Sequence, residues 1–406
     1  MSTTPVEDAE IPAHIPRELV RDFDLYNLPG LESGRTRDLH AVLKAIQDSH
    51  PRLFWTPRYG GHWVATRYAE IERMLQDAQL FSATEPYIPR HTVPRQLPQQ
   101  LDPPEHGPFR KLLMPAFTPP VLARASDRAR ETAIAILERL QPQGRCEFVA
   151  DFAGVMPIIA FLTLIDLPAD DYAYLRGLAV FMTKATHPQS PAAWAEMSEY
   201  VHRQIAMRRE DPRDDFITRL INGKVGDRQL SPEEAFSMVL IVIGGGLDTV
   251  VSMTSFAATF LAQNPAHRHQ LIEQPDLIGG AVEEICRRFG TSNLGRMVRS
   301  DTALGDVPLR EGDMIVGMFP LAGLDEEVNP DPLAVDWSRR QRRYLNFGTG
   351  AHTCIGMPLA KREIRIFLEE WLSRIPDFRL PSGYVPSVTT GIVNSPGELE
   401  LVWDPL

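Results

Sequence analysis

Cysteine is scarce in this chain, and long apolar runs are missing. The three cysteines, Cys146, Cys286 and Cys354, are odd in number and far apart among 406 residues, which argues against a disulfide framework and indicates a reducing compartment. The longest apolar stretch, Met238 to Ile243, is much shorter than the roughly 18 residues that a membrane span needs. The polar start of the chain, residues 1–10, resembles neither a signal peptide nor an anchor. We therefore expect a soluble, cytoplasmic protein with no membrane contact.

The chain also lacks an excess of basic residues over acidic ones. The chain carries 53 acidic and 42 basic side chains, a formal net charge of −11, and phosphate binding needs the opposite balance, so nucleic acid is not expected as a partner. Hydrophobic residues make up 43% of the sequence, which is normal for a folded protein and excludes global disorder. A length of 406 residues exceeds one ordinary core and indicates two lobes, or one large domain built around a cofactor.

Proline and capping signals organise the chain. Residues 1–35 are Pro-rich and predict an extended segment over the surface, and the prolines within 86–104 predict a long loop. The segment 231–234, Ser-Pro-Glu-Glu, is typical of a capping box with proline in the first turn, and only glycine interrupts the helical pattern before Pro265. The pattern predicts a helix of more than thirty residues, about 50 Å long, that crosses the molecule. Shorter elements are expected as helices at 70–76 and 119–140 and as strands at 63–66, 297–300, 314–318 and 399–403.

The strongest chemical signal is the segment 347–356, Phe-Gly-Thr-Gly-Ala-His-Thr-Cys-Ile-Gly. Its glycines permit a tight turn with positive φ, and an amphipathic helix is predicted to follow. Cys354 would lie at the N-terminus of that helix, where the dipole and free N–H groups favour a thiolate. Gly356 leaves room for a flat group beside the backbone. A thiolate beneath a flat cofactor is the axial ligand that promotes O–O cleavage in haem enzymes, whereas the alternative for a lone cysteine is a buried structural role.

Three consecutive glycines interrupt the long predicted helix. Gly244, Gly245 and Gly246 each cost up to about 1 kcal/mol relative to alanine, and Asp248 and Thr249 follow one residue later. One interpretation is that the helix ends here. The helical pattern resumes at once, however, so a bulge that lets a ligand approach the backbone explains both observations.

These features together resemble the cytochrome P-450 superfamily. Its haem-binding signature, F-G-x-G-x-H-x-C-x-G, is matched at every fixed position of 347–356, and its oxygen-binding segment, G-x-[DE]-T, is matched at 246–249. The resemblance implies a single domain over residues 1–406, mainly α with small β-sheets, folded as a triangular prism with a long central helix crossing the haem. It also implies haem b (iron protoporphyrin IX) with Cys354 as the iron ligand, lined by Phe347, Gly348 and Gly356. In the family, the pair Asp248 and Thr249 supplies protons for the reduction of dioxygen.

Charged residues extend the resemblance. The cations that it places around the haem propionates are His106, Arg110, Arg296 and His352, and each alone is more often a surface residue. Arginine suits a propionate because its guanidinium forms paired hydrogen bonds to a carboxylate. Glu284 and Arg287 form the family's E-x-x-R pair, which is structural and joins the segment near Arg339. The alternative for such a pair is a solvated surface ion pair, which contributes little.

The nearest likeness is to the bacterial camphor-hydroxylase family. Shared segments are 87–90, 245–251, 373–378 and 391–393. Where camphor-hydroxylating members place a tyrosine that bonds the ketone, this chain has Pro94, with Gln96 as the nearest polar side chain and Tyr87 as a rival donor. Gly244 and Ser292 replace apolar contacts, which predicts an enlarged pocket. The substrate contacts are expected to be Tyr87, Gln96, Ile241, Gly244, Gly245, Ser292, Leu294 and Val393. A terpenoid or norisoprenoid larger than camphor, ionone-like, is the predicted substrate.

The resemblance further implies electron transfer from a [2Fe–2S] ferredoxin that an NADH-dependent flavoprotein reduces. The basic residues predicted to gather over Cys354 and attract that acidic partner are Arg110, Lys111, Arg339, Arg340, Arg342 and Arg343. Lys184 is expected to pair with Asp248 as a gate. Two alternatives on the same fold are a peroxide-driven peroxygenase and a non-catalytic haem sensor. The Asp248–Thr249 pair argues against both, because neither needs delivered protons.

Overall fold

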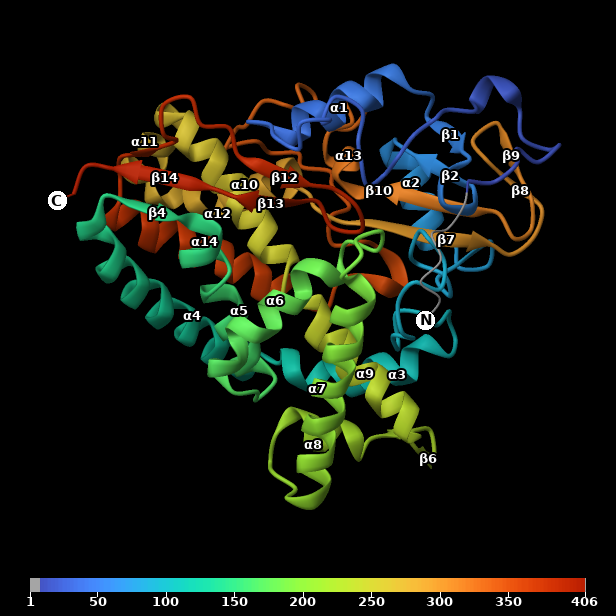
Figure 1. The fold of residues 1–406 in the computed structure, drawn as a ribbon, viewed down its shortest axis with the longest axis horizontal. Helices are drawn as coiled ribbons and strands as arrows, with labels where there is room; N and C mark the ends of the chain where they lie inside the picture. Colours follow the sequence, from blue (N-terminus) through green and yellow to red (C-terminus); the bar gives the residue numbers. More distant parts are fainter. Residues whose placement is uncertain (1–7, 406) are drawn as a thin grey trace.

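The computed structural model describes residues 8–405, and within them the protein is a mainly helical body, with its larger sheet on the right of Figure 1 and smaller sheets elsewhere. This confirms the predicted fold class. The α-helices are α1 (Leu39–Ser49), α2 (Tyr68–Gln76), α3 (His106–Leu113), α4 (Pro119–Leu140), α5 (Met156–Leu164), α6 (Tyr172–Met182), α7 (Ser190–Glu210), α8 (Phe216–Ile221), α9 (Pro232–Gly245), α10 (Thr249–Gln263), α11 (Pro265–Glu273), α12 (Ile278–Arg288), α13 (Phe319–Gly323) and α14 (Met357–Arg374).

The strands form one larger sheet and several small ones. They are β1 (Leu53–Thr56), β2 (His62–Ala65), β3 (Phe81–Ser82), β4 (Arg145–Glu147), β5 (Lys224–Val225), β6 (Arg228–Gln229), β7 (Asn293–Val298), β8 (Thr302–Leu304), β9 (Val307–Leu309), β10 (Met314–Met318), β11 (Phe378–Arg379), β12 (Ser387–Thr389), β13 (Ser395–Glu398) and β14 (Glu400–Trp403). The larger sheet has the order β1-β2-β10-β7-β3, in which β10 runs parallel to β2 and antiparallel to β7. The small sheets contain β11-β14-β4, β12-β13, β5-β6 and β8-β9.

Strand β7 begins earlier than the sequence predicted, at Asn293 rather than near Met297. Asn and Gly are weak strand formers, so the residues before Met297 carry little β signal of their own. Pairing with β10 holds them in register, with Leu294 opposite Gly317 and Arg296 opposite Ile315. Residues two apart on a strand face the same side, so β7 directs Leu294 and Arg296 together toward the middle of the molecule.

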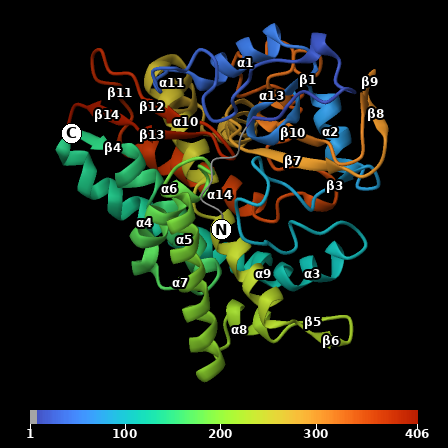
Figure 2. The ribbon, with the colours of Figure 1, turned by 45° about the vertical axis from the view of Figure 1, so that its right-hand side comes forward.

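The long predicted helix is present but interrupted. At its start, Glu234 N donates to Ser231 Oγ at 3.2 Å and Ser231 N donates to Glu234 Oε2 at 2.8 Å, the predicted capping box. Helix α9 ends at Gly245 and α10 begins at Thr249, and both views place the two helices between the sheet and helices α4 to α7 (Figures 1 and 2). A Cβ on Gly246 would lie 2.5 Å from the Phe161 ring, so the close packing of α5 requires glycine in the break.

By length and composition, the segment Pro232–Gln263 is the one helix among the described residues that passes a test for membrane spanning. Within its most apolar window, 61% is buried inside the fold, and the central helix of a globular protein passes the same test.

The N-terminal segment departs from the prediction that it drapes over the surface. Residues 1–7 lie outside the described part of the chain, but Phe23, Leu25 and Leu28 are buried in the main core. The backbone of residues 8–35 has no α-helix or strand, but its apolar side chains fill the core beside α1, because burial of apolar area is favourable. The Pro-rich loop is as predicted, because residues 83–105 contain no helix or strand.

Candidate functional site

The cysteine loop is a tight turn at the start of α14. Cys354 N donates to Phe347 O at 2.7 Å, and Gly348 N donates to Leu345 O at 2.8 Å. Gly348 has a φ of 64°, a conformation that L side chains rarely adopt. Gly356 is the N-cap of α14, so Cys354 lies just before the amino-terminal end of that helix, as predicted.

The Cys354 side chain opens onto a cavity of about 300 Å³, whereas Cys146 and Cys286 are buried in packed surroundings. The surroundings of Cys354 in the protein do not favour the thiolate that the sequence predicted. Shielding from bulk water raises the pKa of the Cys354 thiol, and the N–H groups of Gly356 and Met357 only partly oppose that effect. The N–H groups at the helix N-terminus therefore lower the pKa of the thiol less than the loss of hydration raises it.

All eight residues predicted to hold the cofactor line this one cavity. They are His106, Arg110, Arg296, Phe347, Gly348, His352, Cys354 and Gly356. They come from α3, β7 and the cysteine loop, which are far apart in sequence. Above them, a Cβ on Gly245 would meet nothing within 4 Å, so the break in the long helix leaves open space over the cavity.

The cations of the cavity lack a protein anion. Arg296 is 4% exposed and forms no ion pair with a described carboxylate, and burial lowers its pKa to about 10. The His352 ring lies 4.3 Å from the His106 ring, and its buried Nε2 has no hydrogen-bond partner among the described residues. Burial and the neighbouring charge of Arg296 lower the pKa of His352 to about 3. Unpaired buried cations and ring nitrogens cost free energy unless an anion or acceptor meets them. Haem propionates are such anions, so these residues fit haem.

A second cavity, of about 190 Å³, adjoins the first and shares several lining residues with it. All eight predicted substrate contacts line it: Tyr87, Gln96, Ile241, Gly244, Gly245, Ser292, Leu294 and Val393. The expected enlargement at Gly244 is partly offset. A Cβ there would lie 3.6 Å from Met182 Cε, so Met182 of α6 already approaches the space that a larger side chain would occupy.

Asp248 and Thr249 stand in the helix break, next to both cavities. Thr249 lines the two cavities, and Asp248 lines the smaller one. Burial raises the pKa of the Asp248 carboxyl, and a hydrogen bond from Thr183 Oγ1 to Asp248 Oδ2 at 3.1 Å opposes that effect. The expected Lys184–Asp248 ion pair is not formed, because among the described residues it is Thr183 that contacts the carboxylate, and the charge of Lys184 acts from farther away.

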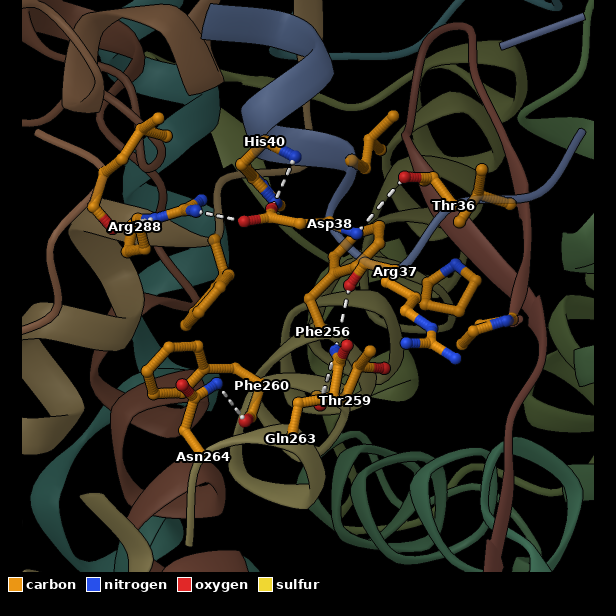
Figure 3. Close-up of a pocket in the computed structure, with 16 residues that line it drawn as sticks. Thr36, Arg37, Asp38, His40, Phe256, Thr259, Phe260, Gln263, Asn264 and Arg288 are labelled. Atoms are coloured by element: carbon orange, nitrogen blue, oxygen red, sulfur yellow. Dashed lines mark hydrogen bonds and ion pairs between the residues drawn. The ribbon is translucent and has the colours of Figure 1, made fainter. Parts of the chain in front are cut away.

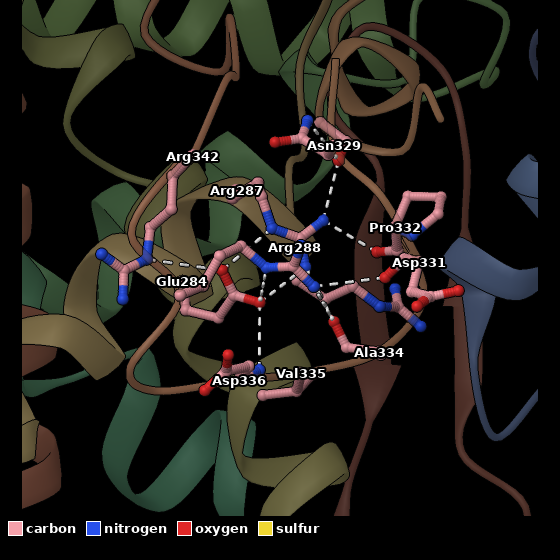
Figure 4. Close-up of polar contacts among 12 residues, drawn as sticks. Glu284, Arg287, Arg288, Asn329, Asp331, Pro332, Ala334, Val335, Asp336 and Arg342 are labelled. Atoms are coloured by element: carbon pink, nitrogen blue, oxygen red, sulfur yellow. Dashed lines mark hydrogen bonds and ion pairs between the residues drawn. The ribbon is translucent and has the colours of Figure 1, made fainter. Parts of the chain in front are cut away.

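Glu284 and Arg287 form a fully buried ion pair on α12 (Figure 4). Arg287 Nε and Nη2 donate to the two Glu284 oxygens at 2.9 and 2.7 Å. The remaining guanidinium N–H groups donate to backbone oxygens of Gly323, Pro332 and Ala334. Arg339 Nε adds a bond to Glu284 Oε1 at 3.1 Å, as predicted. The cluster ties α12 to the end of α13 and to the segment before the cysteine loop.

The predicted basic surface is smaller than expected. Arg339 and Arg342 face Glu284 rather than solvent, with side chains only 12% and 16% exposed. Arg110 lines the larger cavity. The buried carboxylate of Glu284 attracts cations that the sequence pattern suggested for the surface. Lys111, Arg340 and Arg343 remain exposed.

A third cavity, of about 400 Å³, lies between the start of α1 and the end of α10 and contains none of the predicted site residues (Figure 3). Its polar groups bond mainly to one another or to backbone. Asp38 pairs with Arg288, and His40 Nε2 lies 2.8 Å from Gly290 O. Gln263 Nε2 donates to Arg37 O at 3.0 Å. Most of its polar groups are engaged within the protein, although Arg288 Nη1 has no partner among the described residues, and the arrangement is that of a structural cluster.

Several cavity residues carry no sequence signal that would have placed them there. Those of the larger cavity include Leu75, Leu113, Phe161, Met253, Asn346 and Glu363, and those of the smaller one include Val93, Gln99, Ala179, Met182, Thr183, Trp194 and Ile392. Gln99 lies three positions after the predicted contact Gln96 in the same loop, so the sequence could have suggested it as a further cavity residue.

Comparison with known proteins points to one family. The family model described as Cytochrome P450 matches residues 280–380. A probable cytochrome P450 127A1 of Sinorhizobium fredii is 32% identical over 405 residues, which cover 98% of each chain. Mycinamicin IV hydroxylase/epoxidase of Micromonospora griseorubida is 28% identical, over 90% of this chain and 97% of that protein.

Solved structures agree with these relatives. The crystal structure of CYP101J2 superimposes with a TM-score of 0.87 at 36% identity, covering 98% of this chain and 100% of that one. That of CYP101C1 gives a TM-score of 0.87 at 33% identity, covering 97% and 100%.

Proposed function

Since this chain belongs to the cytochrome P450 family and is a haem b monooxygenase, we propose that it hydroxylates a small terpenoid or norisoprenoid, ionone-like, with electrons from a [2Fe–2S] ferredoxin. The reaction would consume the substrate, dioxygen, two protons and two electrons, and release the hydroxylated product and water. The single observation that carries the proposal is the convergence of the predicted haem residues on one cavity that holds Cys354.

The proposed haem residues have different roles according to their position in the cavity. Cys354 would ligate the iron, and His106, Arg110, Arg296 and His352 would hold the propionates, which supplies the anions that these buried groups lack. Haem ligated by a thiolate supplies the activation of dioxygen that allows oxygen to enter an unactivated C–H bond. The protein's own contribution is a dry cavity, an oriented substrate and a route for protons.

Asp248 and Thr249 are the proposed proton route. In the helix break, the buried carboxyl of Asp248 lines the smaller cavity, and Thr249 lines both cavities. Burial raises the pKa of the Asp248 carboxyl, and Thr183 Oγ1 donates a hydrogen bond that orients it. A peroxygenase or a haem sensor would not need this arrangement, which is why the monooxygenase is favoured over both.

The proposed electron donor is acidic, and its docking surface would include the exposed cations Lys111, Arg340 and Arg343. The proposed location is the cytoplasm, where the three cysteines stay reduced. The proposal includes a single domain over residues 1–406, in which the loop 86–104 lies on the substrate side.

An optical spectrum tests the proposed iron ligand directly. The reduced protein under carbon monoxide should show the strongly red-shifted Soret band of a thiolate-ligated haem, because the charged sulfur raises electron density on the iron. A band at the position typical of histidine ligation would contradict the assignment of Cys354. The same spectrometer identifies substrates, since a terpenoid or norisoprenoid that enters the cavity should change the spin state of the oxidised haem.

Replacing Thr249 with alanine should uncouple the reaction. We expect NADH consumption to continue while product formation falls roughly tenfold or more, because proton delivery is lost and the electrons go to peroxide instead. Product, NADH and peroxide would be measured together. Thr254→Ala is the matched control, since Thr254 is fully buried on the same helix and its hydroxyl has no partner among the described residues. An unchanged product yield in Thr249→Ala would remove Thr249 from the route.

A further inference from the structure

The third cavity is separate from the proposed haem and substrate sites. Its lining comes mainly from the segment at the start of α1, the second half of α10, the end of α12 and the hairpin of β12 and β13 (Figure 3). None of its lining residues lines the larger or the smaller cavity. Its volume, about 400 Å³, lies within the range of pockets that bind small organic molecules, so its charge and shape are informative about a ligand.

The third cavity carries more positive than negative charge. Arg37 and Arg288 line it, whereas Asp38 is the one acidic residue of its described lining. The Asp38 carboxylate is shared, because Oδ1 accepts from His40 N at 3.0 Å and Ala41 N at 3.2 Å and Oδ2 accepts from Arg288 Nη2 at 2.5 Å. Arg37 is exposed and forms no ion pair with a described carboxylate. Burial lowers the pKa of His40 to about 4, so its ring adds no charge at neutral pH.

Arg288 is a buried cation whose hydrogen bonds are incomplete. The residue is 2% exposed, and its Nε donates to Leu333 O at 3.0 Å while its Nη2 donates to Asp38. Its Nη1 has no partner among the described residues. Burial lowers the pKa of the guanidinium, as expected where the positive charge is not fully compensated. A buried charged donor without an acceptor costs free energy, which an anion bound in the cavity would recover.

Aromatic rings form much of the remaining wall. Phe256, Phe260 and Phe289 line the cavity together with His40. The His40 ring packs edge-on against Phe256 and Phe289, with ring centroids 5.0 and 5.4 Å apart, and Phe260 lies 5.6 Å from Phe289. Rings that pack on one another in this way present a fixed apolar surface. A molecule that matches both this surface and the cations has an apolar ring and one negative charge.

We propose that the third cavity is a second small-molecule site, which binds a carboxylate carried on an aromatic or alicyclic ring. The carboxylate would accept from Arg288 Nη1 and meet the charge of Arg37, and the ring would pack on Phe256 and Phe260. Guanidinium groups suit carboxylates because their N–H donors are fixed in one plane. The structural cluster around Asp38 holds the walls of this site in place, so little order is lost on binding. This site shares no lining residue with the other two cavities, so the inference does not rest on the proposed function.

Two matched probes test the charge of the site. Benzoate and its neutral analogue benzamide would be titrated calorimetrically into the haem-loaded protein, with 4-phenylimidazole added to occupy the haem. Benzoate should bind at least about tenfold more tightly than benzamide, because only benzoate carries the charge. Arg37→Gln should weaken benzoate about threefold. Arg35→Gln is the matched control, since Arg35 is exposed, donates to Val385 O and does not line the cavity. Equal affinities of the two probes, or equal benzoate binding by the two variants, would overturn the proposal.

A substitution that fills the cavity tests its location. Thr259 of α10 lines the cavity, and its Oγ1 donates to Ser255 O of the same helix, so leucine keeps the helix and adds bulk. Thr259→Leu should weaken benzoate at least about tenfold. A crystal of the unaltered protein soaked with 4-bromobenzoate covers the case in which this variant does not fold. The anomalous signal of bromine should lie between α10 and Arg288, and a signal found only elsewhere, or none, would reject the site while leaving the assignment of Cys354 untouched.

Discussion

Cys354→Ser should lose the red-shifted Soret band of the reduced, carbon monoxide-bound protein, and product formation should fall at least on the order of a hundredfold. Serine is nearly isosteric, but its hydroxyl does not ionise near neutral pH and is a weak ligand for iron. Gly356 and the helix end would be unchanged, so the loss would report the sulfur rather than the turn. Absorption spectra, haem content and product yield would be measured on the same preparation.

A second cysteine serves as the control for that substitution. Cys146 lies in β4, opposite Leu401 of β14, and lines none of the three cavities. Cys146→Ser makes the same chemical change in a buried position and should retain both the red-shifted band and activity. If Cys354→Ser behaved like Cys146→Ser, the iron ligand would have to be another residue, and the proposed function would fail with it.

Most residues of the haem site could be predicted from local sequence patterns. Phe347, Gly348, Cys354 and Gly356 belong to one motif, and their turn is determined by glycine φ angles and short-range bonds such as Cys354 N to Phe347 O. The capping box at Ser231 is local in the same sense. The distant cations His106 and Arg296 were placed by resemblance to a family and not by spacing, and the structure brings them to the same cavity.

The sequence did not predict contacts that depend on how helices pack. Met182 and Thr183 lie at the end of α6, and Trp194 lies on α7, and nothing in their own segments indicates that they meet the α9–α10 break. The same limit explains the wrong gate residue. Lys184 follows Thr183 directly, and only the path of the chain after α6 decides which of the two reaches Asp248. The resemblance placed Arg339 near the Glu284–Arg287 pair, whereas Arg342 has the pattern of a surface charge, and only the fold shows that Glu284 also binds Arg342.

Glu284 and Arg287 are expected to contribute more to stability than the exposed ion pairs of the protein. All five guanidinium N–H groups of Arg287 are used, two on Glu284 and three on backbone oxygens. Lysine keeps the positive charge but has three donors on one nitrogen and cannot reproduce the planar fork. Buried polar groups left without partners are costly, so Arg287→Lys should lower the free energy of unfolding by about 2–4 kcal/mol.

Urea unfolding of the haem-loaded protein would measure that loss, and haem content would fall in parallel because the cluster braces the segment leading to the cysteine loop. Arg365→Lys is the matched control. Arg365 is 48% exposed and lies 3.7 Å from Glu369 on α14, a solvent-screened pair whose replacement should change the free energy of unfolding by less than about 0.5 kcal/mol. Equal stability of the two variants would show that the charge of Arg287, and not its hydrogen-bond geometry, holds α12 against the end of α13. That outcome would make the cluster an ordinary ion pair, and the close approach at Gly323, where a Cβ would lie 2.1 Å from Arg287 O, would then depend on backbone packing alone.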